Sequence, residues 1–197
     1  MKKFFPLLSF LFLGTMVFGQ DLNQDLVDFN LERNKLNQKG MTVLASWSVL
    51  NIAWSSTQLN NSDPLKQSYH QMNLGWNAVN LVIAGFGIYQ AHKFSGDLTV
   101  WQSLEEQASI KRILAVNAAL DLAYVASGFY LREYAFRADN FARYEGFGRA
   151  VIVNGAFLFG FDVLMYWVHH QHELKDLVPL MESLQVGPQS VGIRLSF

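Results

Sequence analysis

Two aspartates and several asparagines interrupt hydrophobic stretches that otherwise carry almost no charge, and these residues are the best suited to chemistry. They are Asn51, Asn77, Asn80, Asn117, Asp121, Asn154 and Asp162. At about 1.5 Å per helical residue, Asn51, Asn80, Asp121 and Asp162 lie roughly 14 to 20 Å from the start of their hydrophobic stretches. They therefore fall near the middle of a hydrocarbon core of about 30 Å. Because lipid satisfies neither amides nor carboxylates, the sequence predicts an inward-facing polar layer in a helical bundle.

This polar layer has two interpretations. In the first, the amides hydrogen-bond across the bundle of a structural or interaction protein, which forms a homo-oligomer or docks with a partner in the cell envelope. In the second, Asp121 and Asp162 are the centre of an intramembrane site that binds a small molecule, a cofactor or an ion, or moves protons. We favour the first interpretation, and neither one identifies a cofactor.

Catalytic signatures are missing from the sequence. Gly85-Phe-Gly87 lacks the further glycine of a dinucleotide-binding fingerprint, and no GxxxxGK, GxSxG or HExxH motif occurs. We therefore expect no enzymatic activity. A net charge of -1 without a basic stripe argues against a nucleic-acid partner, and the lack of cysteine excludes disulfides and thiolate metal sites.

Imidazoles gather where the fourth hydrophobic stretch ends. The weak candidates for metal ligands are His92, His169, His172 and Glu173. His169 and Glu173 are four residues apart and would share one face of a helix, as metal ligands do. The alternative, which we favour, is a solvated helix end where histidines interact with the C-terminal dipole.

The elements that must position these residues are four hydrophobic stretches, 40–62, 67–91, 113–131 and 150–168. The first two hold no charged residue, and the other two hold one aspartate each. Each is long enough to cross a bilayer. Charged residues make up only 16% of the chain, against roughly 25% in soluble domains. We therefore predict an all-α, four-transmembrane-helix bundle over residues 40–174. A soluble four-helix bundle is the alternative, supported by the modest mean hydropathy of +0.12.

The residues before the bundle read as two segments. A short basic start and an apolar run over 4–18 predict a signal peptide at 1–19, with an uncleaved anchor as the alternative. Residues 20–39 predict an amphipathic periplasmic helix that ends at Gly40 and lies on the membrane surface or packs over the bundle.

The signal peptide places the mature N-terminus outside the cytoplasm, and we expect a bacterial inner membrane with lipid as the surrounding partner. The arginine-rich loop at 132–149 then lies inside, as the positive-inside rule prefers, although basic residues elsewhere favour the opposite orientation. Alternating apolar residues in the C-terminal tail, 175–197, resemble a barrel strand and make outer-membrane routing the less favoured alternative.

Three sequence runs, 70–81, 117–131 and 146–166, resemble those of an uncharacterised bacterial family, a domain of unknown function of small four-helix membrane proteins with a signal peptide. The resemblance implies that Asn77, Asn80, Asn117, Asp121 and Asp162 belong to the family pattern. It implies no substrate, cofactor or partner.

Overall fold

The structure is a computed structural model that describes the backbone of residues 5–185 and the side chains of residues 23–182. Its helices are α1 (Phe5–Thr57), α2 (Pro64–His92), α3 (Val100–Ala135), α4 (Phe141–His172), the π-helical segment η1 (Glu173–Leu177) and α5 (Val178–Gln185). No strand occurs within residues 5–185, so the predicted all-α fold is confirmed over that part of the chain.

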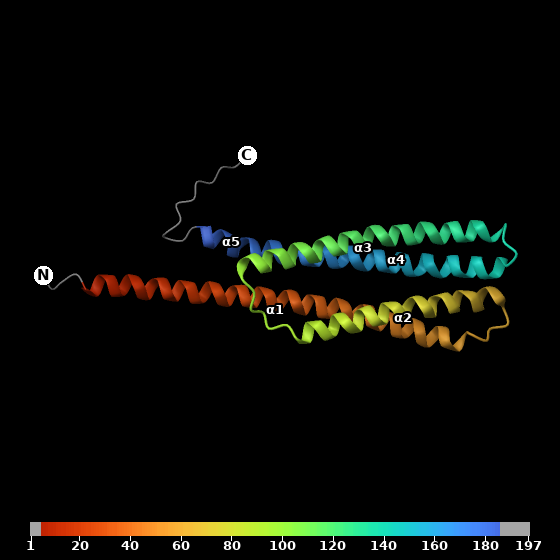
Figure 1. The fold of residues 1–197 in the computed structure, drawn as a ribbon, viewed down its shortest axis with the longest axis horizontal. Helices are drawn as coiled ribbons and strands as arrows, with labels where there is room; N and C mark the ends of the chain where they lie inside the picture. Colours follow the sequence, from red (N-terminus) through yellow and green to blue (C-terminus); the bar gives the residue numbers. More distant parts are fainter. Residues whose placement is uncertain (1–4, 186–197) are drawn as a thin grey trace, which may run out of the picture.

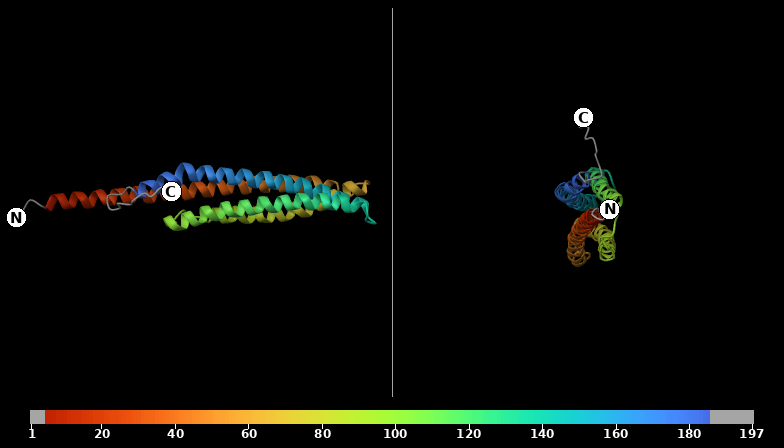
Figure 2. Two further views of the ribbon diagram at one scale, coloured as in Figure 1. Left: turned by 90° about the horizontal axis from the view of Figure 1, so that it is seen from above. Right: turned by 90° about the vertical axis from the view of Figure 1, so that its left-hand side faces the viewer.

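The four long helices form an elongated bundle of two antiparallel pairs (Figure 1). α1 packs along α2, α3 packs along α4, and the pairs join chiefly through α2 and α4. The view along the bundle axis shows one pair beside the other (Figure 2). α2 and α3 make little contact although they follow one another in the chain. The side of the bundle between α2 and α3 is therefore loosely packed.

Local sequence signals start three of these helices. Asp63 caps α2 by accepting from the backbone N–H of Leu65, with Pro64 in the first turn, where a missing N–H costs nothing. Thr99 forms a reciprocal capping box with Gln102 at the start of α3, and Asn140 caps α4. These caps fix where the turns between the helices lie.

α1 is one uninterrupted helix, so the predicted helix end at Gly40 is wrong. Gly40 is buried in the middle of α1, where an added Cβ would lie 2.5 Å from Met165 Cε. This glycine serves close packing between α1 and α4 and does not terminate a helix. The predicted signal peptide is described only as α1 backbone from Phe5 onward.

Residues 20–39 pack over the bundle, which was one of the two positions expected for them. Leu26 and Phe29 are buried in a small core with Leu177 of η1 and Leu180 of α5. The predicted C-terminal tail thus begins as helix, continuing through η1 and α5 to Gln185. The alternating residues 191–197 lie outside the described residues.

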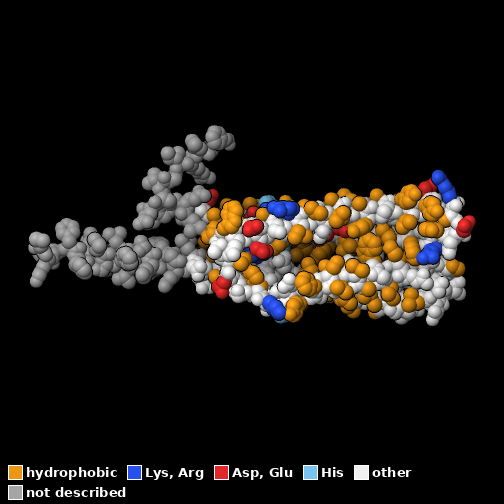
Figure 3. Space-filling model, in the orientation of Figure 1, with side chains coloured by type: hydrophobic (Ala, Val, Ile, Leu, Met, Phe, Trp, Pro, Cys, Tyr) orange, Lys and Arg blue, Asp and Glu red, His pale blue; other side chains and the backbone are white. Residues whose placement is uncertain are grey.

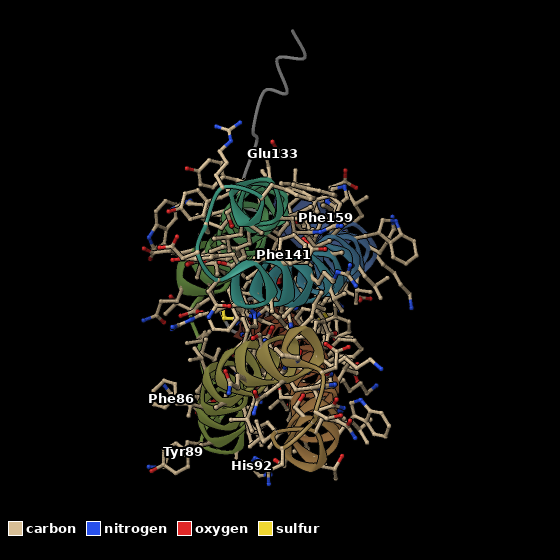
Figure 4. All side chains as sticks on the ribbon, turned by 90° about the vertical axis from the view of Figure 1, so that its right-hand side faces the viewer. Phe86, Tyr89, His92, Glu133, Phe141 and Phe159 are labelled. Carbon is tan, nitrogen blue, oxygen red and sulfur yellow. The ribbon has the colours of Figure 1, made fainter. Side chains whose placement is uncertain are left out.

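The bundle has a polar interior and an apolar exterior. Among the described side chains, buried polar residues outnumber buried hydrophobic ones, and large hydrophobic side chains are exposed along α1, α2, α3 and α4. Figure 3 shows apolar atoms over much of one face, and Figure 4 shows Phe86 and Tyr89 projecting outward from α2. A water-soluble bundle has the opposite distribution.

Two segments, Val100–Ala135 and Phe141–Glu182, are long and apolar enough to cross a membrane. α1 and α2 are long too, but serine and asparagine occupy much of their inward faces: Ser48, Ser55, Asn73, Asn77 and Asn80. These polar side chains lower the hydropathy of both helices.

Candidate functional site

The predicted polar layer forms two separate groups. The first is an amide cluster made of Asn51, Asn73, Asn77 and Asn154, which ties α1, α2 and α4 together. Asn154 Nδ2 donates to Asn73 Oδ1 at 2.7 Å, and Asn77 Nδ2 donates to Asn154 Oδ1 at 2.9 Å. Asn73 Nδ2 in turn donates to Asn51 Oδ1 at 3.0 Å.

The amide cluster is largely self-sufficient. The side chains of Asn51, Asn77 and Asn154 also donate to the backbone carbonyl four residues earlier on their own helices. Asn77 Oδ1 is the member atom left without a donor among the described residues. Asn73 was not among the candidate residues of the layer, although the sequence places it on the same polar face of α2, one turn before Asn77. The cluster suits helix association better than ligand binding.

The second group lines a cleft of about 840 Å³ that opens between α2 and α3, with α1 and α4 behind it. Figure 3 shows it as a hollow between the two helical pairs. Of the predicted site residues, Asn80, Asn117, Asp121 and Asp162 contribute to it. Its walls are mainly apolar: Val79, Ile83, Ile110, Ile113, Leu114, Leu120, Leu158 and Phe161.

Asp121 and Asp162 form an acid pair in this cleft. Both are buried, and their carboxyl groups are close enough to influence each other electrostatically, Asp121 from α3 and Asp162 from α4. A direct bond between two carboxyl groups needs one proton between them, because two ionised groups only repel. Asp162 lies eight residues after Asn154 on α4, about 12 Å along the helix, so the acid pair and the amide cluster lie at different depths.

Two buried polar atoms at the cleft lack partners within the described part of the chain. Asp121 Oδ2 receives no hydrogen bond, and Asn80 Nδ2 donates none. Such atoms are rare in folded proteins and point to an absent partner. A hydroxyl group is both donor and acceptor, so it has the chemistry to satisfy either atom.

The cleft has an aromatic end and a polar end. Trp76 of α2 and Tyr124 of α3 meet edge to face with ring centroids 5.0 Å apart, close to the acid pair. The polar end is lined by Arg33, Asn34, Asn37, Gln90 and Glu106. Glu106 precedes Asp121 by fifteen residues on α3, so the polar end and the acid pair are about 22 Å apart.

Arg33 is the unexpected residue of the polar end. It is 2% exposed, and its Nη1 donates to the backbone carbonyl of Ser103 at 2.9 Å. Burial lowers the pKa of Arg33, and the charge of Glu106 opposes that shift. The guanidinium nevertheless stays protonated near neutral pH. Sequence reasoning missed this residue, although Arg33 continues the stripe of Leu26 and Phe29 that faces the bundle.

The predicted metal ligands are not gathered into one site. Within residues 23–182 no three side chains of the metal-binding kinds lie together. His92 contacts Gln38, His172 contacts Asp176, and Glu173 pairs with Lys111. His169 is fully buried, with neither ring nitrogen in a hydrogen bond to a described residue.

Comparison with known proteins places the chain in a family. The model of a family of unknown function matches residues 43–163. That stretch includes the amide cluster and the acid pair, whereas Arg33 lies before it. No curated protein and no solved structure matches the chain significantly. The chain therefore belongs to the family of unknown function DUF6992, consistent with the resemblance seen in its sequence.

Proposed function

We propose that the protein spans a membrane with four helices and binds an elongated amphiphile in the cleft between α2 and α3. The inverted polarity of the bundle supports the membrane placement. Val82 and Phe86 on α2, and Leu50 and Trp54 on α1, are all more than half exposed, although neither helix is one of the two segments that are long and apolar enough to cross a membrane. In water such a surface would aggregate, whereas in lipid it is favourable.

We further propose a bacterial inner membrane, with the mature N-terminus outside the cytoplasm. Arg132, Arg137, Arg143 and Arg149 then lie on the cytoplasmic side at the loop between α3 and α4, as the positive-inside rule prefers. In this orientation the polar end of the cleft, around Arg33, lies near the outer surface.

The observation that carries the binding proposal is the unsatisfied pair of atoms in an apolar cleft. The cleft volume lies within the range of small-molecule sites, and its opening faces the surrounding lipid. An amphiphile with a hydroxyl group could enter sideways, donate to Asp121 Oδ2 and accept from Asn80 Nδ2. Its apolar body would cover the walls.

A structural role fits the amide cluster. Its hydrogen bonds join α1, α2 and α4 within one chain and leave little capacity for a ligand. We propose that the amide cluster holds these helices together. This is the role that the first interpretation of the polar layer gave to the asparagines. A homo-oligomer or an envelope partner would use other surfaces.

The test compares two long-chain probes that differ only by one hydroxyl group, oleyl alcohol and (Z)-9-octadecene. Full-length protein in a neutral detergent is titrated with each, and native mass spectrometry counts the bound molecules. We expect oleyl alcohol to bind at least tenfold more tightly than (Z)-9-octadecene, and this difference in affinity to shrink in the double variant Asp121→Asn/Asp162→Asn. Asp139→Asn, the same change at an exposed position, is the matched control and should bind like the unchanged protein. Equal affinity for both probes would overturn the proposal.

A further inference from the structure

We infer that the polar end of the cleft is a subsite for an anionic headgroup, centred on Arg33. The inference rests on the proposed function, because it assigns the charge of the amphiphile that the cleft holds. The headgroup chemistry is a carboxylate or a phosphate monoester at one end of a long apolar chain.

The first argument is the unbalanced charge of Arg33. Its guanidinium lies over the ring of Phe29 at 5.6 Å, and one of its nitrogens donates to the Ser103 carbonyl. No carboxylate among the described residues comes within ion-pair distance of it. Buried charges are normally paired, so a buried arginine that lines a cleft without a counter-ion indicates an anion from outside the chain.

The second argument is the set of free donors beside Arg33. The side-chain amides of Asn37, which is half-buried, and Gln90, which is exposed, line the same end of the cleft, and neither is hydrogen-bonded to a described residue. Amide N–H groups and a guanidinium are the donors that carboxylate and phosphate oxygens take. Three separate side chains from α1 and α2 can therefore surround one headgroup.

Glu106 is the acidic residue at the polar end of the cleft, and its carboxylate provides a test of the inference. It lies close enough to influence Arg33 electrostatically but makes no ion pair with it, and it is exposed on α3. A bound anion would be repelled by this carboxylate. Neutralising Glu106 should consequently strengthen the binding of an anionic amphiphile, an effect that a purely structural role of Arg33 does not predict.

The length of the cleft agrees with a long chain. The polar end and the acid pair are about 22 Å apart along α3, and the wall between them is apolar at Ile110, Ile113 and Leu114. A headgroup held at Arg33 would leave its chain along this wall, with its far end near Asp121, so a hydroxyl group at that far end would meet Asp121 and Asn80 as in the proposed function.

The experiment uses four probes on the full-length protein in neutral detergent at low salt. Oleic acid carries a carboxylate, oleoyl lysophosphatidic acid a phosphate, monoolein a neutral headgroup on the same chain, and inorganic phosphate has no chain. We expect at least one anionic amphiphile to bind tenfold or more tightly than monoolein, and the tighter of the two identifies the headgroup. Inorganic phosphate that binds as tightly as the lysophosphatidic acid would overturn the assignment to an amphiphile.

The variants are Arg33→Gln, Arg33→Lys, Glu106→Gln and the control Lys35→Gln. Lys35 lies on the same helix but is exposed and paired with Glu32. We expect Arg33→Gln to remove the preference for anionic probes without weakening the binding of monoolein. Lys35→Gln should keep that preference. Arg33→Lys should retain part of the preference, and Glu106→Gln should raise the affinity for anions several-fold. These last two variants test the inference if Arg33→Gln does not fold.

The outcomes separate this inference from the function on which it rests. Monoolein binding that depends on Asp121 and Asp162, together with no effect of Arg33→Gln or Glu106→Gln on anionic probes, would leave the cleft proposal in place and overturn the headgroup subsite. Failure of every amphiphile to bind would overturn both.

Discussion

Trp76 and Tyr124 contact each other edge to face across α2 and α3, two helices that otherwise make little contact. Trp76 precedes Asn80 by one turn, and Tyr124 follows Asp121 by nearly one turn. The aromatic contact therefore bounds the cleft directly beside the acid pair, where both helices also line it. The same contact therefore contributes both to the packing of α2 against α3 and to the retention of a ligand in the cleft.

Replacing Trp76 by alanine should open this end of the cleft. We expect bound oleyl alcohol to dissociate several-fold faster, and the free energy of unfolding to fall by about 1 kcal/mol, the size of an aromatic pair interaction. Dissociation is followed by dilution and native mass spectrometry. Trp101→Ala, at an exposed position outside the cleft, is the control and should leave the dissociation rate unchanged. An unchanged rate in Trp76→Ala would show that the contact does not retain the ligand.

Asn154→Ala should destabilise the bundle without emptying the cleft. It leaves Asn73 Oδ1 and Asn77 Nδ2 without their partner on α4, so the free energy of unfolding should fall by about 1 to 2 kcal/mol. Unfolding in sodium dodecyl sulfate, followed by circular dichroism, measures the change, with the exposed loop residue Asn60 replaced by alanine as the control. A loss of oleyl alcohol binding equal to that of the aspartate variants would contradict the separation of amide cluster and cleft.

Most of the helices and most of the inward-facing polar residues could be predicted from the sequence, because the hydrophobic periodicity and the composition of each stretch determine them. Stretches of membrane length with at most one charged residue predict long helices, and amides that face inward must hydrogen-bond with one another. The grouping of these residues was not predictable in the same way. Whether Asn154 meets Asn77 or Asp162 meets Asp121 depends on which helices pack together, and the separation of α2 from α3 has no local signal in the sequence.

Arg33 and Gly40 show a second limit of the sequence. Arg33 lies in a segment that the sequence places either on the membrane surface or over the bundle, and its burial follows from the stripe that it shares with Leu26 and Phe29, which are buried against η1 and α5. Gly40 was read as a helix end, because glycine commonly follows a helix. Glycine inside a helix can equally mark close packing, and only the contact with Met165 distinguishes the two.

Gly128 and Gly160 should respond to alanine with opposite signs. A Cβ at Gly128 would lie 2.8 Å from the backbone oxygen of Gly148 and 2.7 Å from Ile152 Cγ1, so Gly128→Ala should force α3 and α4 apart and cost about 1 to 3 kcal/mol. Gly160 has nothing within 4 Å of an added Cβ, and Gly160→Ala should stabilise its helix by about 0.5 to 1 kcal/mol. Detergent unfolding of both variants checks the signs, and destabilisation of similar size in both would contradict the close packing at Gly128.

Glu145→Gln should weaken the end of the bundle that holds the arginine-rich loop. Glu145 is almost fully buried, and its carboxylate accepts from Arg132 Nε at 3.1 Å and from Arg149 Nε at 2.7 Å. Because both arginines are partly exposed and screened by solvent, we expect a loss of about 1 to 2 kcal/mol, less than a fully buried pair would give. Glu133→Gln, which removes an exposed partner of Arg137, should cost under about 0.5 kcal/mol. The free energy of unfolding of both variants is measured at low and at high salt. High salt screens the ion pairs and should reduce the difference in free energy of unfolding between the two variants. Equal effects of both substitutions at low salt would mean that Glu145 does not hold α3 and α4 together through Arg132.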